Sequence, residues 1–238
     1  MRCLSGKSAV SLLTLTWFAL SWGVASSAFA DGPRVSAEEV REFEILVKDK
    51  PVGTSTIRIR NLDDGTTRVA TEVNVKLNYL VYVYRYEFHG DELWRGNRLL
   101  SAQNRATDDG KEFAARLVVS PGGSSIEANG RARRGPVIAM TTNYWRTPEL
   151  VPGTKINLMN ADRGTVHSVT VEVVGQEKIV VDRQVIECTH YRLGGDLEAE
   201  FWSDPLNRIV RQKSVEDGYP TEVRLTRISA APTRTAQR

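Results

Sequence analysis

Hydrophobic and polar residues alternate along most of the chain, and the longest such run lies between Val69 and Tyr79. Every second residue of this run is apolar or Thr, whereas Glu72, Asn74 and Lys76 occupy positions between them. Because successive side chains of a β-strand point to opposite faces, this pattern places one face on a core and the other in solvent. The run predicts a half-buried strand.

The same alternation recurs in shorter segments, and turn-forming residues separate them. Glycine after aspartate, as at Asp64-Gly65, supplies the positive φ that tight hairpins need. Eight to twelve strands joined mostly by hairpins predict an all-β fold, a single antiparallel meander that forms an open or partly closed barrel. The shorter segments are Thr56–Arg60, Ser168–Val173, Val185–Leu193, Leu197–Trp202 and Val223–Ile228.

Helical periodicity is almost absent. Short helical turns are predicted only at Ser36–Arg41, where Ser36 can cap the first turn, and at Thr147–Leu150. No shift in composition divides the chain, so residues 31–229 are predicted to form a single antiparallel β domain. Residues 230–238 contain mainly small and polar side chains and are predicted to be a disordered tail.

Residues 1–30 have the pattern of a secretory signal peptide. Arg2 and Lys7 precede the apolar stretch Ala9–Leu20, and the segment ends in the small-x-small triplet Ala28-Phe29-Ala30. Ser and Thr interrupt the apolar stretch, which is also short for a membrane span, so a retained anchor is the weaker interpretation. We expect cleavage near Ala30 and a mature protein that is periplasmic or secreted.

Removing this segment changes what the composition implies. The full chain has a formal charge of +3, and the loss of Arg2 and Lys7 without any acid lowers it to +1. A nearly neutral chain argues against nucleic-acid binding driven by bulk charge. Of the two cysteines only Cys188 remains, which excludes an intramolecular disulfide.

An aromatic stripe is predicted on one face of the strand that precedes residue 90. It consists of Tyr82, Tyr84, Tyr86 and Phe88, and the opposite face turns polar toward its end. Either a bulge near Leu80 exchanges the two faces, or the strand is covered on both sides. Such a stripe is typical of a packed core, and also of a concave sheet that holds a ligand.

The segment Met140–Leu150 lacks clean alternation but carries two large aromatic residues, Tyr144 and Trp145. Two interpretations fit it. The segment is either a lid across the mouth of a half-barrel or a plug that completes the core.

Several motifs resemble an uncharacterised family of secreted bacterial β-rich proteins, a domain of unknown function. The resemblance covers most of residues 43–213 and implies a β-rich fold. It extends more distantly to the half-barrel periplasmic proteins that carry lipoproteins, and it implies neither an activity nor a site residue. The motifs are Tyr84–Leu99 with its Glu-x-Trp, the turn Thr107–Gly110, the pair Tyr144-Trp145, Tyr191–Asp196 and Trp202–Pro205.

Candidate catalytic chemistry is sparse. His89, His167 and His190 lie on predicted strands and are weak candidates for a metal site with Cys188 as a fourth ligand, but no pair has a close ligand spacing. Neither a metal nor another cofactor is therefore expected, and Cys188 is predicted to be a buried, unreactive thiol. The basic run Arg131–Arg134 is either a peripheral contact with an anionic envelope surface or a solvated edge that discourages strand pairing.

Together these features favour an exported, non-enzymatic envelope protein that binds an apolar or amphipathic, lipid-like ligand on a curved β-sheet. The alternative is a structural or assembly factor that binds a protein partner in the cell envelope through an open sheet edge. A histidine-dependent metalloenzyme is a weaker third hypothesis. The residues expected to line or cover the ligand are Tyr82, Tyr84, Tyr86, Phe88, Trp94, Tyr144 and Trp145.

Overall fold

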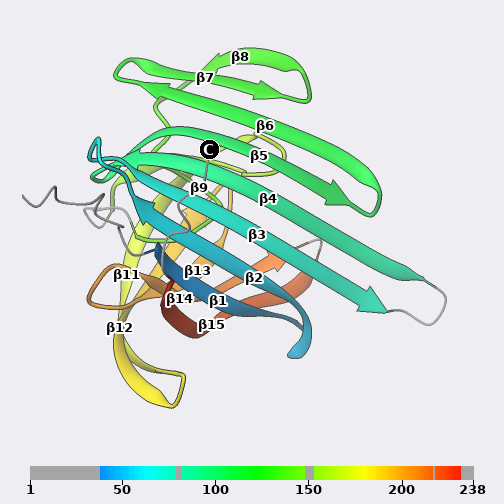
Figure 1. The fold of residues 1–238 in the computed structure, drawn as a ribbon, viewed down its shortest axis with the longest axis vertical. Coiled ribbons are helices and arrows are strands. Elements are labelled where there is room, and N and C mark those ends of the chain that lie inside the picture. The colour runs from blue at the N-terminus through cyan, green and yellow to red at the C-terminus, as the bar shows by residue number, and fades with distance from the viewer. Residues whose placement is uncertain (1–37, 79–81, 148–152, 217, 232–238) are drawn as a thin grey trace, which may run out of the picture. The chain divides into compact units, whose positions relative to one another are not determined.

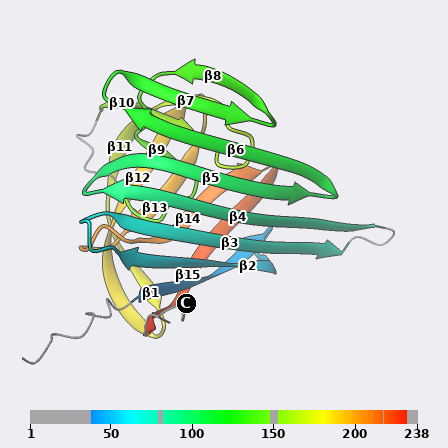
Figure 2. The ribbon, with the colours of Figure 1, turned by 45° about the horizontal axis from the view of Figure 1, so that its top comes forward.

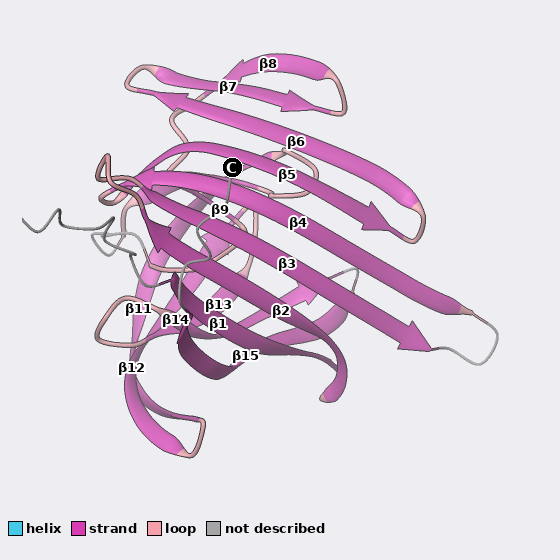
Figure 3. Ribbon diagram, viewed as in Figure 1, coloured by secondary structure: helices cyan, strands magenta, loops and turns pink. Residues whose placement is uncertain are grey.

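The alternating segments of the sequence form strands, and these strands pair into one continuous sheet (Figure 3). The computed structural model describes residues 38–78, 82–147, 153–216 and 218–231, which all belong to the unit Val35–Arg238. The strands are β1 (Glu38–Val47), β2 (Lys50–Asn61), β3 (Thr67–Asn78), β4 (Val83–Arg95), β5 (Arg98–Asp108), β6 (Lys111–Ser120), β7 (Gly123–Ala128), β8 (Arg131–Gly135), β9 (Met140–Thr141), β10 (Lys155–Met159), β11 (Val166–Val181), β12 (Gln184–Gly195), β13 (Ala199–Ser203), β14 (Ile209–Glu216) and β15 (Tyr219–Ala231).

The chain enters this sheet in the middle and also leaves it in the middle. From β1 it adds strands outward to β8 at one edge, continues at β9 on the other edge, and returns to β15, which pairs with β1. Neighbouring strands are antiparallel, apart from the parallel pair β9 and β10. The predicted all-β, antiparallel, open fold is confirmed, with fifteen strands in the described residues rather than eight to twelve.

A short connection makes the sheet curl. Gly135 ends β8 and Met140 begins β9, so only the segment 136–139 joins the two edges. Such a link spans at most about 18 Å, whereas fifteen strands laid flat would hold the edges about 67 Å apart. The sheet therefore bends back on itself until its edges come close, although no pairing between described strands closes it.

The curled sheet has two arms, the first formed by β1 to β8 and the second by β9 to β15. Side chains from both arms meet in a filled interior. Figures 1 and 2 show β2 to β7 side by side in one layer, with β11 to β14 behind them. The main hydrophobic cluster joins Val69, Trp94 and Leu117 of the first arm to Leu158 and Phe201 of the second. In the described residues, the concave face of the sheet is thus packed by side chains.

The domain starts with a strand, although the sequence predicts a capped helical turn there. The helical turn predicted at Ser36–Arg41 is wrong from Glu38 onward, because β1 begins there and pairs with β2 on one side and β15 on the other. Arg41 and Phe43 of this strand are both buried, which a solvated helical turn would not achieve.

Other local predictions fall wholly or mainly outside the described residues. These are the signal peptide, the bulge near Leu80, the helical turn at Thr147–Leu150 and residues 232–238 of the predicted tail. The first two residues of that tail, Ala230 and Ala231, are not disordered, because they end strand β15 and pair with β1. Within the ranges described, no helix has the length and apolar character that a membrane crossing requires.

Candidate functional site

The aromatic residues predicted to line a ligand do not form one group. Tyr84 and Tyr86 are half-buried near the start of β4, and Tyr82, just before the strand, is 46% exposed. Phe88 is buried in a small separate cluster with Phe113. That these residues contact a ligand remains a prediction.

The other three predicted residues are buried in the main cluster. Trp94 and Trp145 meet edge to face, with their ring centroids 5.6 Å apart, and Tyr144 stacks on Phe201 at 6.3 Å. A ligand could reach Trp94 and Trp145 only if the segment that carries Trp145 moved away.

That segment, Met140–Thr147, is here called the strap, and Glu92 of β4 holds its first half. The Glu92 carboxylate accepts hydrogen bonds from Thr141 Oγ1, from Asn143 Nδ2 at 2.9 Å and from Trp94 Nε1 at 2.8 Å. Burial raises the pKa of Glu92, although these three hydrogen bonds oppose the shift.

The second half of the strap is held by contacts from both arms of the sheet. Arg41 on β1 donates a hydrogen bond from Nη1 to the backbone oxygen of Trp145. On the other arm, Thr147 Oγ1 lies 2.9 Å from Ser203 Oγ. In this structure the strap therefore completes the core.

The turn Asn160–Thr165 packs into the same interior beside the strap. Asn104 Nδ2 donates to the oxygen of Ala161 at 2.7 Å, and Arg133 Nη2 donates to the oxygen of Gly164 at 2.7 Å. Gly164 has a φ of 69°, and a Cβ there would lie 3.0 Å from the Cβ of Ala128. The turn therefore fits against the first arm only with glycine at this position.

The three histidines lie on different strands, β4, β11 and β12. His89 is exposed, and His167 Nε2 lies 3.1 Å from the hydroxyl of Thr165. Among the residues that the structure describes, no three His, Cys, Asp or Glu side chains are grouped so that they could hold a metal ion.

Cys188 on β12 is fully buried, and burial raises the pKa of its thiol to about 11. The thiol is therefore protonated near neutral pH. A protonated, inaccessible thiol is a poor nucleophile, as the sequence predicted.

A β-bulge gives the β11–β12 hairpin two different buried faces. Relative to β12, strand β11 has one extra residue at Val174. Before the bulge, Val171 and Leu193 share the buried face, whereas beyond it the opposite face, with Val181 and Cys188, is buried. The outer half of the hairpin therefore packs on a different surface from the inner half.

Strand β13 pairs with β12 beside this part of the hairpin, and side chains on the newly buried face make contacts with it. The His190 ring stacks on Trp202 with centroids 4.2 Å apart, and His190 Nδ1 lies 2.8 Å from Glu177 Oε1. Trp202 Nε1 donates to the other oxygen of Glu177 at 2.9 Å. Glu177 of β11 is thus hydrogen-bonded to Trp202 and lies in contact with the His190 ring.

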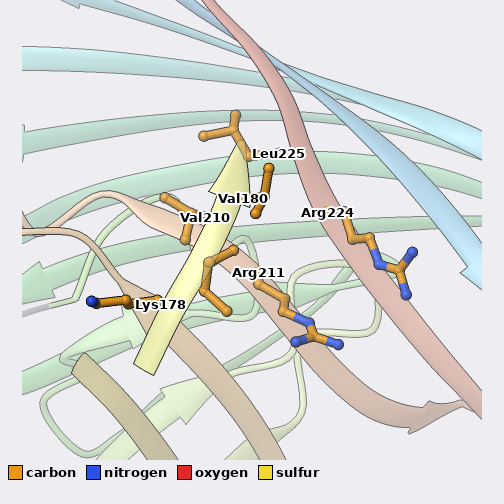
Figure 4. A pocket seen from close by; sticks show the side chains of 7 residues that line it. Lys178, Val180, Val210, Arg211, Arg224 and Leu225 are labelled. Atoms are coloured by element: carbon orange, nitrogen blue, oxygen red, sulfur yellow. The ribbon is translucent and has the colours of Figure 1, made fainter. Parts of the chain in front are cut away.

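A cleft of about 280 Å³ lies between this part of β11 and the strands β14 and β15 (Figure 4). Val210 and Leu225 are buried, Ile179 is partly buried, and Val180 is 66% exposed. The cleft thus combines an apolar surface with access from solvent. Its lining residues are Lys178, Ile179, Val180, Val210, Arg211, Arg224 and Leu225.

Two arginines of the cleft share one buried carboxylate. Glu222 accepts hydrogen bonds at 2.6 Å from Arg211 Nε, and at 2.6 and 2.9 Å from Nε and Nη2 of Arg224. Burial alone would raise the pKa of Glu222, but these contacts outweigh it and lower the pKa to about 2. The carboxylate is ionised at neutral pH, and the pair of arginines retains one net positive charge.

A larger, shallow hollow of about 820 Å³ lies on β3 to β6. Charged side chains of both signs line it, and an ion pair between Arg68 and Asp91 occupies part of it. Because ionised side chains such as Arg68, Asp91 and Arg116 stand among its lining residues, an apolar chain laid there would have to desolvate them.

The cleft does not follow from the alternation of the sequence. The predicted strands Ser168–Val173 and Val185–Leu193 leave out the part of β11 that carries Lys178, and in a regular strand Arg224 is an ordinary polar position. The available signal was the sequence Val173-Val174-Gly175, because two successive apolar residues before a glycine break the alternation as a bulge does.

The fold resembles that of a solved β-barrel-like protein. The β-barrel-like protein of domain of unknown function DUF1849 from Brucella abortus superposes with a TM-score of 0.62 at 9% sequence identity. The match covers 84% of this chain and 100% of that one. At this identity the likeness concerns the fold alone.

The sequence itself gives a family. No curated protein matches it closely enough to indicate a relationship. Residues 43–226, by contrast, match the family described as "Domain of unknown function (DUF6134)". The expected membership of an uncharacterised β-rich family is therefore confirmed: the chain belongs to the DUF6134 family.

Proposed function

We propose that the protein is an exported, non-enzymatic envelope protein that binds an apolar or amphipathic, lipid-like ligand in the cleft between β11 and β14–β15. The supporting observation is the apolar lining of a solvent-accessible cleft, formed by Ile179, Val180, Val210 and Leu225. Each Å² of apolar surface that a ligand buries there contributes about 25 cal/mol to binding. The export part of the proposal rests on the signal-peptide pattern of residues 1–30.

The filled interior supports the choice of the cleft over the concave face. Trp94 and Trp145 already bury each other there, and Glu92 and Arg41 bind the strap that covers them. A ligand on the concave face must first break these contacts. The cleft needs no such rearrangement.

Fluorescence of the uncharged probe N-phenyl-1-naphthylamine tests the site. In Val180→Asp, binding of the probe should weaken at least about tenfold, because an apolar ligand would desolvate the new carboxylate. Val185→Asp is the matched control. Val185 is the residue of β12 that pairs with Val180 and is 65% exposed, but it does not line the cleft. Equal affinity in both variants would place the probe elsewhere.

Mass spectrometry of the protein purified from its native envelope tests whether such a ligand is present. We expect a co-purifying lipid-like molecule that is depleted in Val180→Asp and retained in Val185→Asp. Absence of any such molecule, together with no binding of the probe, would overturn the proposal.

A protein partner bound at an open sheet edge is the second candidate function. The observation that favours it is strand β8, an edge strand in which Arg131 to Arg134 are all exposed. Crosslinking in the envelope distinguishes the two functions. A reproducible protein adduct at β8 supports the partner, whereas a lipid adduct at β11 supports the ligand.

A further inference from the structure

We infer that the ligand of the cleft is an anionic amphiphile with a single apolar chain, whose acidic head group is bound by Arg211 and Arg224. This inference rests on the proposed function, since it names the class of ligand for the same cleft.

The charge inventory of the cleft is the first argument. Lys178, Arg211 and Arg224 line it, and Glu222, bound to both arginines, is the carboxylate in direct contact with them. Asp49 and Glu44 attract Arg224 without forming an ion pair with it in the described residues. Among the residues that line the cleft or form an ion pair with its arginines, three positive charges therefore stand against one negative charge.

The second argument concerns the hydrogen-bond donors that remain. A guanidinium group has five N–H donors. Among the described residues, Glu222 engages only Nε of Arg211, and only Nε and Nη2 of Arg224. Both Nη atoms of Arg211 and Nη1 of Arg224 can therefore donate to an anion. The Arg224 side chain is 45% exposed and that of Arg211 is 23% exposed, so a ligand can reach them.

Acidic groups near Arg211 are already engaged with other partners. The guanidinium carbon of Arg211 lies 4.8 Å from the ring centroid of Trp202, whose Nε1 is bound to Glu177. Glu200 lies 3.2 Å from Arg192 and 3.4 Å from His190. These carboxylates therefore do not neutralise the free donors of Arg211.

The side chains in Figure 4 indicate how a ligand would be oriented in the cleft. Both guanidinium groups lie on one side of β11, and the side chains of Val180, Val210 and Leu225 gather near its end. Lys178 points to the opposite side of the strand. A head group at the two arginines thus places the chain of the amphiphile along the apolar residues.

The size of the cleft limits the ligand to one chain. Its volume of about 280 Å³ lies just below the range of roughly 300–1,000 Å³ that small-molecule sites span. Two acyl chains need more room than that, whereas part of a single chain fits and the rest can extend past the exposed Val180.

Displacement of N-phenyl-1-naphthylamine by three dodecyl amphiphiles, each below its critical micelle concentration, tests the inference. On the wild-type protein at pH 7, dodecanoate should displace the probe at a concentration about tenfold or more below that of dodecanol or dodecyltrimethylammonium, because charge-assisted hydrogen bonds form only with the acid. The advantage should shrink as salt is added.

Arg224→Gln should remove most of the preference for dodecanoate over dodecanol. Arg227→Gln is the matched control, because Arg227 is exposed on the same strand and does not line the cleft. The head-group series on the wild-type protein decides the question even if Arg224→Gln fails to fold.

The outcomes separate the two proposals. Equal displacement by all three amphiphiles would overturn the anionic head group and leave the proposed function intact. Displacement by none of them, with no binding of the probe, would overturn the proposed function itself. Displacement only by an apolar peptide would replace the amphiphile with a protein segment.

Discussion

Glu92 on β4 and Glu222 on β15 are both buried carboxylates, but they are held by partners of different kinds. Glu92 is 1% exposed and accepts hydrogen bonds only from uncharged donors, whereas Glu222 is 8% exposed and accepts them from two guanidinium groups. Burial therefore dominates at Glu92 and raises its pKa, while the arginines lower the pKa of Glu222 to about 2.

The difference separates a packed region from a region that can bind. Around Glu92, the hydrogen bonds tie the strap to β4, and aromatic rings fill the neighbouring space. Around Glu222, two arginines share one carboxylate beside an unfilled apolar cleft. Similar groups thus complete a core in one place and leave charge and space for a ligand in the other.

The largest effect should come from removing an aromatic ring of the packed region. Trp94→Ala leaves a cavity beside Trp145 and removes the donor to Glu92, so unfolding in urea should show a loss of about 3–5 kcal/mol. Val118→Ala is the control, because Val118 is 59% exposed and should change stability by less than about 0.5 kcal/mol. A loss below about 1 kcal/mol in Trp94→Ala would mean that the interior is loosely packed and has room for a ligand.

The strands of this molecule could be predicted from the sequence because their signal is local. In β3, the residues Val69, Thr71 and Val73 alternate with more exposed ones, and packing against the hydrophobic clusters buries or half-buries that face. Membership of a β-rich family and the buried state of Cys188 could be predicted for the same reason. Both depend on residue types at neighbouring positions.

The cleft could not be predicted because long-range packing creates it. Lys178 and Arg224 are far apart in the sequence, and they line one cleft in a part of the hairpin whose buried face the bulge at Val174 has exchanged. The sequence also predicts that Trp94 and Trp145 belong to one site. Alternation alone does not show whether the two rings pack together or line a space. The strap contacts of Glu92 and Arg41 decide that point.

The second-largest effect should come from changing Glu222, the buried carboxylate beside the cleft. Glu222→Gln removes charge-assisted hydrogen bonds to Arg211 and Arg224 and should cost about 2 kcal/mol of unfolding free energy at pH 7. Because the pKa of Glu222 is lowered in the folded state, its contribution is fully present above the ordinary value of 4.5 and is lost as the pH falls through about 2. The difference between wild type and variant should therefore vanish over that interval.

Urea unfolding from pH 7 to pH 2 measures this difference. Glu198→Gln is the control, since Glu198 is exposed in the connection before β13 and should show no comparable dependence. A difference that persists unchanged at pH 2 would indicate that Gln disturbs packing, and would remove the electrostatic account of the cleft.

The smallest effect should come from Glu92→Gln, and its pH dependence should have the opposite sign. Because burial raises the pKa of Glu92, its contribution to stability is full below the ordinary value of 4.5 and is lost as the pH rises through the raised pKa of the folded state. Gln mimics the protonated acid and cannot ionise. Relative to wild type, the variant should therefore gain unfolding free energy as the pH increases over that range.

Glu87→Gln, an exposed position on the same strand, controls for general charge effects and should follow wild type at every pH. A variant of Glu92 that instead loses stability with rising pH would show that the donors Thr141, Asn143 and Trp94 outweigh the cost of burying the charge. The two carboxylates would then behave alike. The distinction between a packed region with uncharged donors and a binding region with arginines would have to rest on the cleft alone.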